Sequence, residues 1–153
     1  MNIKYNFSGK HVLITGGARG IGLEMSRQFL AAGAKVTVWD FSPDSLTAAK
    51  SALSSFAASI HFQQVDVSKL ASCEQAAARL SDGVDILINN AGITRDKSFN
   101  KMTPEDFEAV IQTNLNGVFW VTKSVMPKFK AESLHKRIIK IGRASCRERV
   151  SSP

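Results

Sequence analysis

The chain has 153 residues, of which 44% are hydrophobic and 22% charged, and this composition is that of one ordinary globular domain. No segment has the length of a membrane span or the features of a signal peptide, so we expect no membrane partner and a cytoplasmic location. The formal net charge of +7 gathers towards the end of the chain and not along a whole face, which argues against a nucleic-acid partner. Two cysteines and three scattered histidines predict neither a disulfide framework nor a metal site.

Short apolar runs alternate along the chain with segments of helical periodicity. The runs cover residues 11–15, 35–40, 60–67, 84–90 and 137–141, and such alternation is typical of repeated βαβ units in a parallel sheet. The predicted fold class is therefore α/β: an incomplete, Rossmann-type doubly wound parallel sheet of about five strands in the order 3-2-1-4-5. Residues 1–141 are assigned to the N-terminal part of this dinucleotide-binding domain, and residues 142–153 to a non-native or disordered tail.

Helices are expected between these strands. The first has Ile21, Met25 and Phe29 at every fourth position, which predicts a buried face. The second begins at Ser42, a favourable N-cap residue that is followed by a proline. The third covers residues 70–81.

A fourth, longer helix is expected after the loop of residues 91–102. Thr103 and Asp106 resemble a capping box, and the helix runs to about residue 130. One amide, Asn114, shares its buried stripe with Phe107, Ile111, Val118 and Val125. Because a buried amide without a partner costs about 1–3 kcal/mol, Asn114 is expected to have partners. Bonding to neighbouring backbone is the structural alternative to a functional role.

The stretch TGGARGIG, residues 15–22, joins the first strand to the first helix. Gly16, Gly20 and Gly22 permit a sharp turn and a close approach of ligand to backbone. The free N–H groups and partial positive charge of the helix N-terminus favour an anion, naturally a pyrophosphate. No Gly-Lys-Ser/Thr follows, so the loop is not a P-loop, and a merely structural turn is the alternative.

Two charged residues near this loop bear on the choice of dinucleotide. Asp40 closes the second strand, where a carboxylate can accept hydrogen bonds from the adenosine ribose and would repel a 2′-phosphate. Arg19 has the opposite effect, because it offers a cation to such a phosphate. NAD(H) is therefore favoured as the cofactor, with NADP(H) as the alternative.

TGGARGIG, the Asp66-Val67 pair after the third strand and NNAG at residues 89–92 together resemble the short-chain dehydrogenase/reductase family. The resemblance covers residues 7–141, and the stretch that begins at NNAG looks closest to 3-oxoacyl-thioester reductases, including acetoacetyl-CoA reductases. It implies an oxidoreductase that transfers hydride between NAD(P)H and a small-molecule carbonyl or alcohol. It also implies a homo-oligomer, either a dimer or a tetramer.

The resemblance further implies roles for single residues. Asp66 would bond the adenine amino group, Val67 would pack near the adenine ring, and Asn89 would tie the central strands together. Asn114 would hold a water that links the active site to solvent, and it is the one catalytic residue implied. The cofactor-binding set expected is Gly16, Ala18, Arg19, Gly20, Ile21, Gly22, Asp40, Asp66, Val67, Asn90, Ala91 and Gly92.

The groups that complete catalysis in this family are missing from the sequence. The nascent alkoxide needs a proton donor, which in the family is a Tyr, assisted by a Lys four residues later and by a Ser. The only tyrosine is Tyr5, and no lysine follows Lys140. We therefore expect this chain to bind a dinucleotide without turning over a substrate. A binding module or a redox-sensing regulator is the alternative function.

The end of the chain departs from the periodic pattern. Residues 143–153 hold three arginines and no apolar period, and residues 141–150, IGRASCRERV, are the translation of a string common in sequencing adapters. We expect the native coding sequence to stop at residue 140 or 141, with a genuine arginine-rich tail as the alternative. Independent DNA read past codon 140 separates the two, because recovery of the same tail would exclude the adapter.

Overall fold

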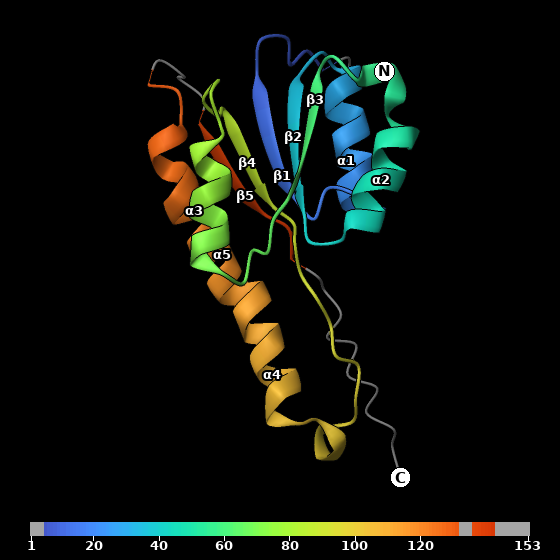
Figure 1. The fold of residues 1–153 in the computed structure, drawn as a ribbon, viewed down its shortest axis with the longest axis vertical. Helices are drawn as coiled ribbons and strands as arrows, with labels where there is room; N and C mark the ends of the chain where they lie inside the picture. The colour runs from blue at the N-terminus through green and yellow to red at the C-terminus, as the bar shows by residue number, and fades with distance from the viewer. Residues whose placement is uncertain (1–4, 132–135, 143–153) are drawn as a thin grey trace.

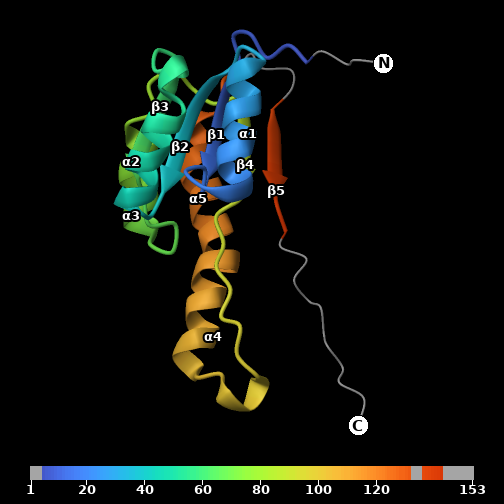
Figure 2. The ribbon, with the colours of Figure 1, turned by 90° about the vertical axis from the view of Figure 1, so that its right-hand side faces the viewer.

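The computed structural model describes residues 5–131 and 136–142. Within them, a five-stranded sheet of parallel pairs has the order β3-β2-β1-β4-β5, which confirms the predicted fold class. Helices cover both faces of this sheet (Figures 1 and 2). Residues 143–153, nearly all of the predicted tail, lie outside the described part. The strands are β1 (His11–Thr15), β2 (Lys35–Asp40), β3 (Ile60–Gln64), β4 (Ile86–Asn89) and β5 (Arg137–Lys140).

β1 is the central strand and is buried on both faces. Val12, Leu13 and Ile14 are each fully buried, and successive residues belong to two different core clusters. One cluster includes residues of α1 (Gly20–Ala31) and α2 (Pro43–Ala52), and the other includes residues of α3 (Leu70–Ala78) and α5 (Gly117–Val125). This two-sided burial explains why the strand reads as a continuous apolar run.

β3 and β4 are both shorter than the predicted strands of residues 60–67 and 84–90. β3 stops at Gln64, which lies opposite Asp40, the last residue of β2. β4 starts at Ile86, and the N–H of Val84 donates to the carbonyl of Lys128, 2.8 Å away. The residues after β3 therefore leave the ladder and reach the carboxyl edge of the sheet.

The buried face of α1 agrees with the predicted one in part, because Met25 and Phe29 are half-buried and pack against the core. Gly22, Ser26 and Leu30 are buried, whereas Ile21 is 67% exposed. The buried positions recur every four residues, and at Gly22 the helix approaches the carbonyl of Gly16, the residue that follows β1. Short 3-10 turns follow α2 and precede α4: η1 (Ser54–Phe56) and η2 (Phe99–Lys101).

The predicted long fourth helix consists of four helical segments: α4 (Pro104–Ile111), the π-helical turn η3 (Gln112–Asn116), α5 and the 3-10 turn η4 (Met126–Lys128). The predicted capping box of Thr103 and Asp106 opens α4. Because α4 projects beyond the sheet (Figures 1 and 2), Phe107 of the predicted buried stripe is 59% exposed, while Val125 in α5 is fully buried. Among the described residues, no helix has the length and apolarity needed to cross a membrane.

Candidate functional site

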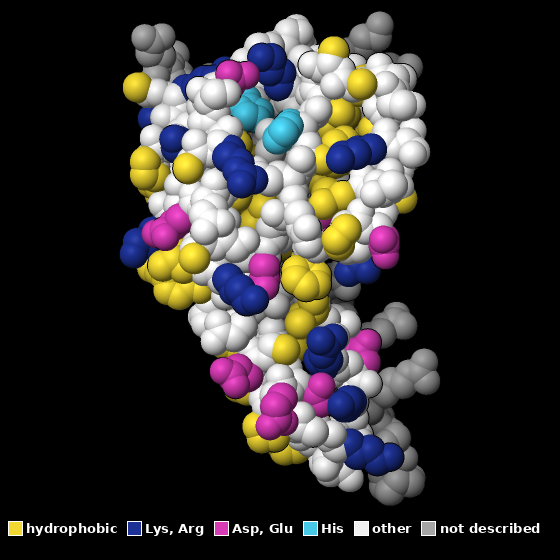
Figure 3. All heavy atoms as spheres, viewed as in Figure 1, with side chains coloured by type: hydrophobic (Ala, Val, Ile, Leu, Met, Phe, Trp, Pro, Cys, Tyr) yellow, Lys and Arg dark blue, Asp and Glu magenta, His cyan; other side chains and the backbone are white. Residues whose placement is uncertain are grey.

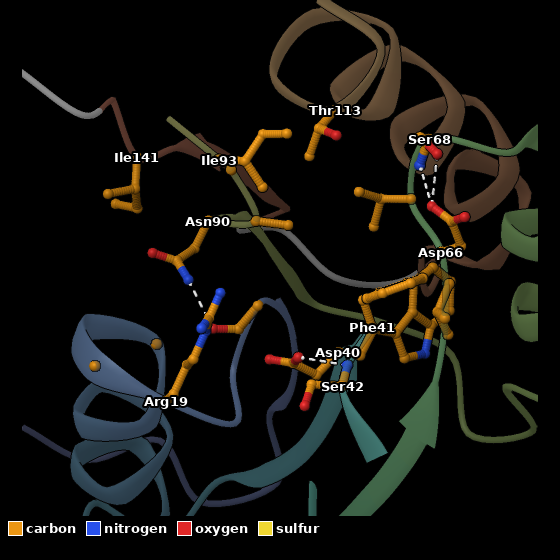
Figure 4. A pocket seen from close by; sticks show the side chains of 18 of the residues that line it. Arg19, Asp40, Phe41, Ser42, Asp66, Ser68, Asn90, Ile93, Thr113 and Ile141 are labelled. Carbon is orange, nitrogen blue, oxygen red and sulfur yellow. Dashed lines mark hydrogen bonds between the residues drawn. The ribbon is translucent and has the colours of Figure 1, made fainter. Parts of the chain in front are cut away.

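A cavity of about 760 Å³ opens at the carboxyl ends of the central strands, where the strand order reverses between β1 and β4. A volume of this size suits a cofactor-sized ligand, and the switch point is where doubly wound sheets bind their ligands. Figure 4 shows side chains converging on it from the start of α1, from the ends of β2 and β3, and from the loop after β4. Of the expected cofactor-binding set, Ala18 alone is not part of the lining; the other members form it together with residues such as Phe41, Ser68, Ile93, Arg95 and Thr113.

At two of its glycines, Gly16 and Gly22, the glycine loop has room for backbone alone. At Gly16, where φ is +62°, an added Cβ would lie 2.9 Å from the Cα of Ala91. At Gly22 it would lie 2.0 Å from the carbonyl oxygen of Gly16. The N–H groups in the first turn of α1 have no intrahelical partner, and Gly20, Ile21 and Gly22 of that turn border the cavity. These residues therefore fit the diphosphate of a dinucleotide.

Thr15 and Asn90 fasten this loop to the end of β4. The Asn90 Nδ2 atom donates to the carbonyls of Thr15, at 3.0 Å, and Gly16, at 2.9 Å. The Thr15 Oγ1 atom accepts from the backbone N–H groups of Asn90 and Ala91, both at 3.1 Å. Sequence reasoning missed Thr15, although a hydroxyl at the end of a buried apolar run was a usable signal, because buried hydroxyls need partners.

Asp40 is only 7% exposed and holds two turns of the chain. Its Oδ2 atom accepts from the N–H of Ala18 and its Oδ1 atom from the N–H of Ser42, both at 3.1 Å. Ala18 thus supports the site from behind the cavity wall. The carboxylate keeps unused lone pairs that ribose hydroxyls can address. Arg19, which Figure 4 shows near Asn90, has no side-chain hydrogen-bond or ion-pair partner within the described residues.

Asp66 and Val67 follow β3 and form the neighbouring wall. The Asp66 Oδ1 atom accepts from the N–H of Ser68, at 3.0 Å, and from its hydroxyl, at 2.6 Å. The Oδ2 atom lies 3.5 Å from the Lys69 ammonium, and the Asp66 side chain remains 25% exposed. These bonds fix the carboxylate at the edge of the cavity and leave part of it accessible.

Asn114 lies in the π-helical turn, next to the cavity but outside its lining. Its Oδ1 atom accepts from the N–H of Ile93 and its Nδ2 atom donates to the carbonyl of Ile93, both at 2.9 Å. The amide therefore has the backbone partners that we described as the structural alternative. The water-holding role stays a prediction. Asn89, expected to tie strands together, instead donates its side-chain N–H to Thr122 of α5, at 3.2 Å.

Asp106 docks the loop of residues 91–102 onto the start of α4. Its carboxylate lies 2.6 Å from the Lys97 ammonium and 3.8 Å from the Arg95 Nε atom. It also accepts the N–H of Thr103 at 3.2 Å. Chiefly because of the hydrogen bond from Lys97, the pKa of Asp106 is held below its usual range. The loop thereby presents Ile93 and Arg95 to the cavity, and sequence reasoning missed both.

Phe41 was also missed, although it lines the cavity and is 68% exposed.

No tyrosine or lysine is among the described residues of the lining. Tyr5 precedes β1 and is 69% exposed. Lys140 ends β5, and partial burial lowers its pKa.

This geometry, a doubly wound parallel sheet with a cavity at its switch point, defines a Rossmann-type α/β domain. Residues 10–152 match the short chain dehydrogenase family. The chain belongs to that family.

Relatives and solved structures agree with this assignment. The chain is 36% identical over 137 residues to the 3-oxoacyl-[acyl-carrier-protein] reductase FabG of Escherichia coli (strain K12), which covers 90% of this chain and 56% of the relative. It is 44% identical over 113 residues to an acetoacetyl-CoA reductase of Rhizobium meliloti (strain 1021), which covers 72% and 45%. The Pseudomonas aeruginosa RhlG/NADP active-site complex has a TM-score of 0.82 at 28% identity and covers 93% of this chain and 57% of its own. The chain spans about half the length of the curated relatives it matches.

Proposed function

We propose that the whole protein reduces the carbonyl of a 3-oxoacyl thioester, or a similar small molecule, to a hydroxyl with NAD(H). The single observation that carries this proposal is the close packing of the glycine loop at Gly16 and Gly22, which we call the glycine cradle. A Cβ at Gly22 would lie 2.0 Å from the Gly16 carbonyl. Such an approach of backbone to backbone leaves peptide groups free to face a diphosphate. The thioester substrate is supported by the likeness to FabG and acetoacetyl-CoA reductases.

Different residues of the cavity would bind different parts of the cofactor. The first turn of α1 would hold the pyrophosphate, and Asp66 would accept from the adenine amino group. Asn90, Ala91 and Gly92 would line the ribose and nicotinamide side. When bound, the nicotinamide supplies hydride to the carbonyl carbon of the substrate.

The preference for NAD(H) over NADP(H) is supported by Asp40. Its carboxylate is 7% exposed, is oriented by the N–H groups of Ala18 and Ser42, and lines the cavity. A 2′-phosphate beside this carboxylate would meet charge repulsion. We expect NADH to bind more tightly than NADPH, and Asp40→Asn to narrow that difference.

We further propose that this chain binds the cofactor without completing the reaction. A carbonyl reductase must protonate the nascent alkoxide, and no tyrosine or lysine is found among the described residues that line the cavity. The cytoplasmic location stays a prediction.

Two measurements on the 153-residue chain test this proposal. NADH fluorescence titration should show binding, and NADH should not be oxidised when acetoacetyl-CoA is added. Turnover by this chain would contradict the missing-acid argument. Absence of binding would contradict the cofactor site. If the protein made from a full-length gene binds NADH but reduces no carbonyl substrate, that result would favour the alternative, a redox-sensing regulator.

The expected homo-oligomer is supported by apolar side chains on the projecting helical arm. Phe107, Leu115, Phe119 and Met126, from α4, η3, α5 and η4, are 54–63% exposed, and Figure 3 shows hydrophobic side chains on this part of the molecule. Exposed apolar side chains gathered on one element mark interaction surfaces. We propose a second copy of the chain as the occupant. Light scattering should report a dimer or tetramer that Phe119→Glu weakens, and an unchanged mass for Phe119→Glu would contradict this surface.

A further inference from the structure

Phe41 continues one row of β2 beyond the end of the sheet. Side chains alternate along a strand, so Thr37, Trp39 and Phe41 belong to one row. The first two are 3% and 0% exposed, whereas Phe41 is 68% exposed and lines the cavity. A large aromatic ring thus stands where the row leaves the sheet and reaches the site.

The main chain on both sides of Phe41 is fixed. The Gln64 Nε2 atom donates to the carbonyl of Phe41 at 3.3 Å, and the N–H of Val65 donates to the carbonyl of Asp40 at 2.9 Å. The next residue, Ser42, caps α2 and donates its N–H to the Asp40 Oδ1 atom at 3.1 Å. The exposed ring is therefore carried by an ordered turn.

The surroundings of the ring suit a flat, polar-edged group. Figure 4 shows Phe41 between Asp40 and Asp66, and Val67, 8% exposed, lies on the same wall. An aromatic face gains most from a second planar π system, and nucleobases stack on such faces whatever their identity. The carboxylates of Asp66 and Asp40, which line the same cavity, can accept hydrogen bonds from the edge of a base and from its sugar.

We propose that Phe41 is the platform on which the adenine ring of the dinucleotide stacks, so that it sets the affinity for the base without reading which base is present. The inference rests on the proposed function and adds a residue that determines the strength of cofactor binding. Discrimination between bases then falls to the neighbouring carboxylate of Asp66, and that between riboses to Asp40.

Three reduced nucleotides separate these contributions in fluorescence titrations of the 153-residue chain: NADH, reduced nicotinamide hypoxanthine dinucleotide and reduced nicotinamide mononucleotide. Phe41→Ala should weaken the first two alike, on the order of tenfold, because stacking tolerates either base. It should leave the affinity for the mononucleotide unchanged, since that ligand lacks the purine ring. Phe41→Tyr keeps the ring and should bind like the wild type.

Phe99→Ala is the matched control, because Phe99 is 93% exposed and outside the cavity lining; it should bind all three ligands like the wild type. If Phe41→Ala binds NADH as tightly as the wild type, the role of Phe41 is wrong while the proposed function stands. The same holds if Phe41→Ala loses as much affinity for the mononucleotide as for NADH. A wild-type chain that binds neither NADH nor the mononucleotide would overturn the proposed function and the platform with it. Circular dichroism confirms that each variant is folded.

Discussion

The amide of Asn114 closes two hydrogen bonds with the backbone of one residue, Ile93, each 2.9 Å long. This pair joins the π-helical turn between α4 and α5 to the loop that follows β4. Ile93 lines the cavity, so the two bonds hold part of the cavity wall against the π-helical turn. We propose that Asn114 is a positioning residue for this wall; π-helical turns inside α-helices occur frequently at functional sites. A relay role in the whole enzyme would be additional to it.

Asn114→Ala should lower the free energy of unfolding by about 1–3 kcal/mol, because it leaves the N–H and the carbonyl of Ile93 without their partners. Urea unfolding measures this loss. Asn116→Ala is the control, since within the described part of the chain the Asn116 side chain bonds only that of Gln112, and its cost should stay below about 0.5 kcal/mol. Equal costs for the two variants would contradict the positioning role.

Asp106→Asn should loosen the loop of residues 91–102, because it removes the charge that attracts Lys97 and Arg95. The folded pKa of Asp106 is lowered from 3.8, so the stabilisation from its charge is present above that pH and is lost as the pH falls through the folded pKa. Hydrogen exchange at pH 7 should be faster in this loop than in the wild type. Asp96→Asn, in the same loop, should exchange like the wild type. If Asp106→Asn and the wild type show identical protection in this loop, Asp106 does not hold the loop in place.

His11 should make the chain less stable in mild acid. Its Nε2 atom lies 2.8 Å from the Thr37 hydroxyl and its Nδ1 atom 2.6 Å from the Gly83 carbonyl. Burial lowers the pKa of His11 below 6.5, and of the nearby charges Lys130 acts in the same direction while Asp82 and Asp85 oppose it. The stabilisation by the neutral ring is therefore present above pH 6.5 and is lost as the pH falls.

The Tm of the wild type should consequently drop between pH 7 and pH 5 by more than that of His11→Asn. His61→Asn, which changes an exposed histidine, should keep the wild-type slope. Parallel slopes for the wild type and His11→Asn would count against this account.

Cys73 should resist alkylation in the folded chain. It is fully buried in α3, and desolvation raises the pKa of its thiol to about 12, so almost none is thiolate at neutral pH. In a Cys146→Ser background, mass spectrometry should find no iodoacetamide adduct at pH 7 without urea and complete modification in urea. Rapid modification of the folded protein would show that the α3 packing is wrong.

Elements with a strong local signal could be predicted from the sequence. The continuous apolar run of β1 and the caps at Ser42 and Thr103 appear as expected, because burial on both faces and N-cap chemistry depend on neighbouring residues. The strand order is also as expected. The need for glycine at residue 22 is similarly local, since an added Cβ there would meet the carbonyl of Gly16 in the same loop.

Contacts between distant parts of the chain could not be predicted in this way. Ile93 and Asn114 are 21 positions apart, and nothing in either segment alone specifies that they meet. The exposure of Phe107 depends on α4 projecting past the sheet, which periodicity does not reveal. Phe41 differs in burial from Trp39 only because the strand ends between them.

We propose above all that the glycine cradle, in the turn between β1 and α1, binds the diphosphate of a dinucleotide. Gly22→Ala places a methyl group 2.0 Å from the Gly16 carbonyl unless the loop shifts. The control is Gly9→Ala: its φ of +75° strains an alanine, a strain that Gly22 does not share, but no atom lies within 4 Å of the added Cβ. In an NADH titration of folded protein, Gly22→Ala should lose at least on the order of tenfold in affinity while Gly9→Ala binds like the wild type. Wild-type affinity in folded Gly22→Ala would contradict the account.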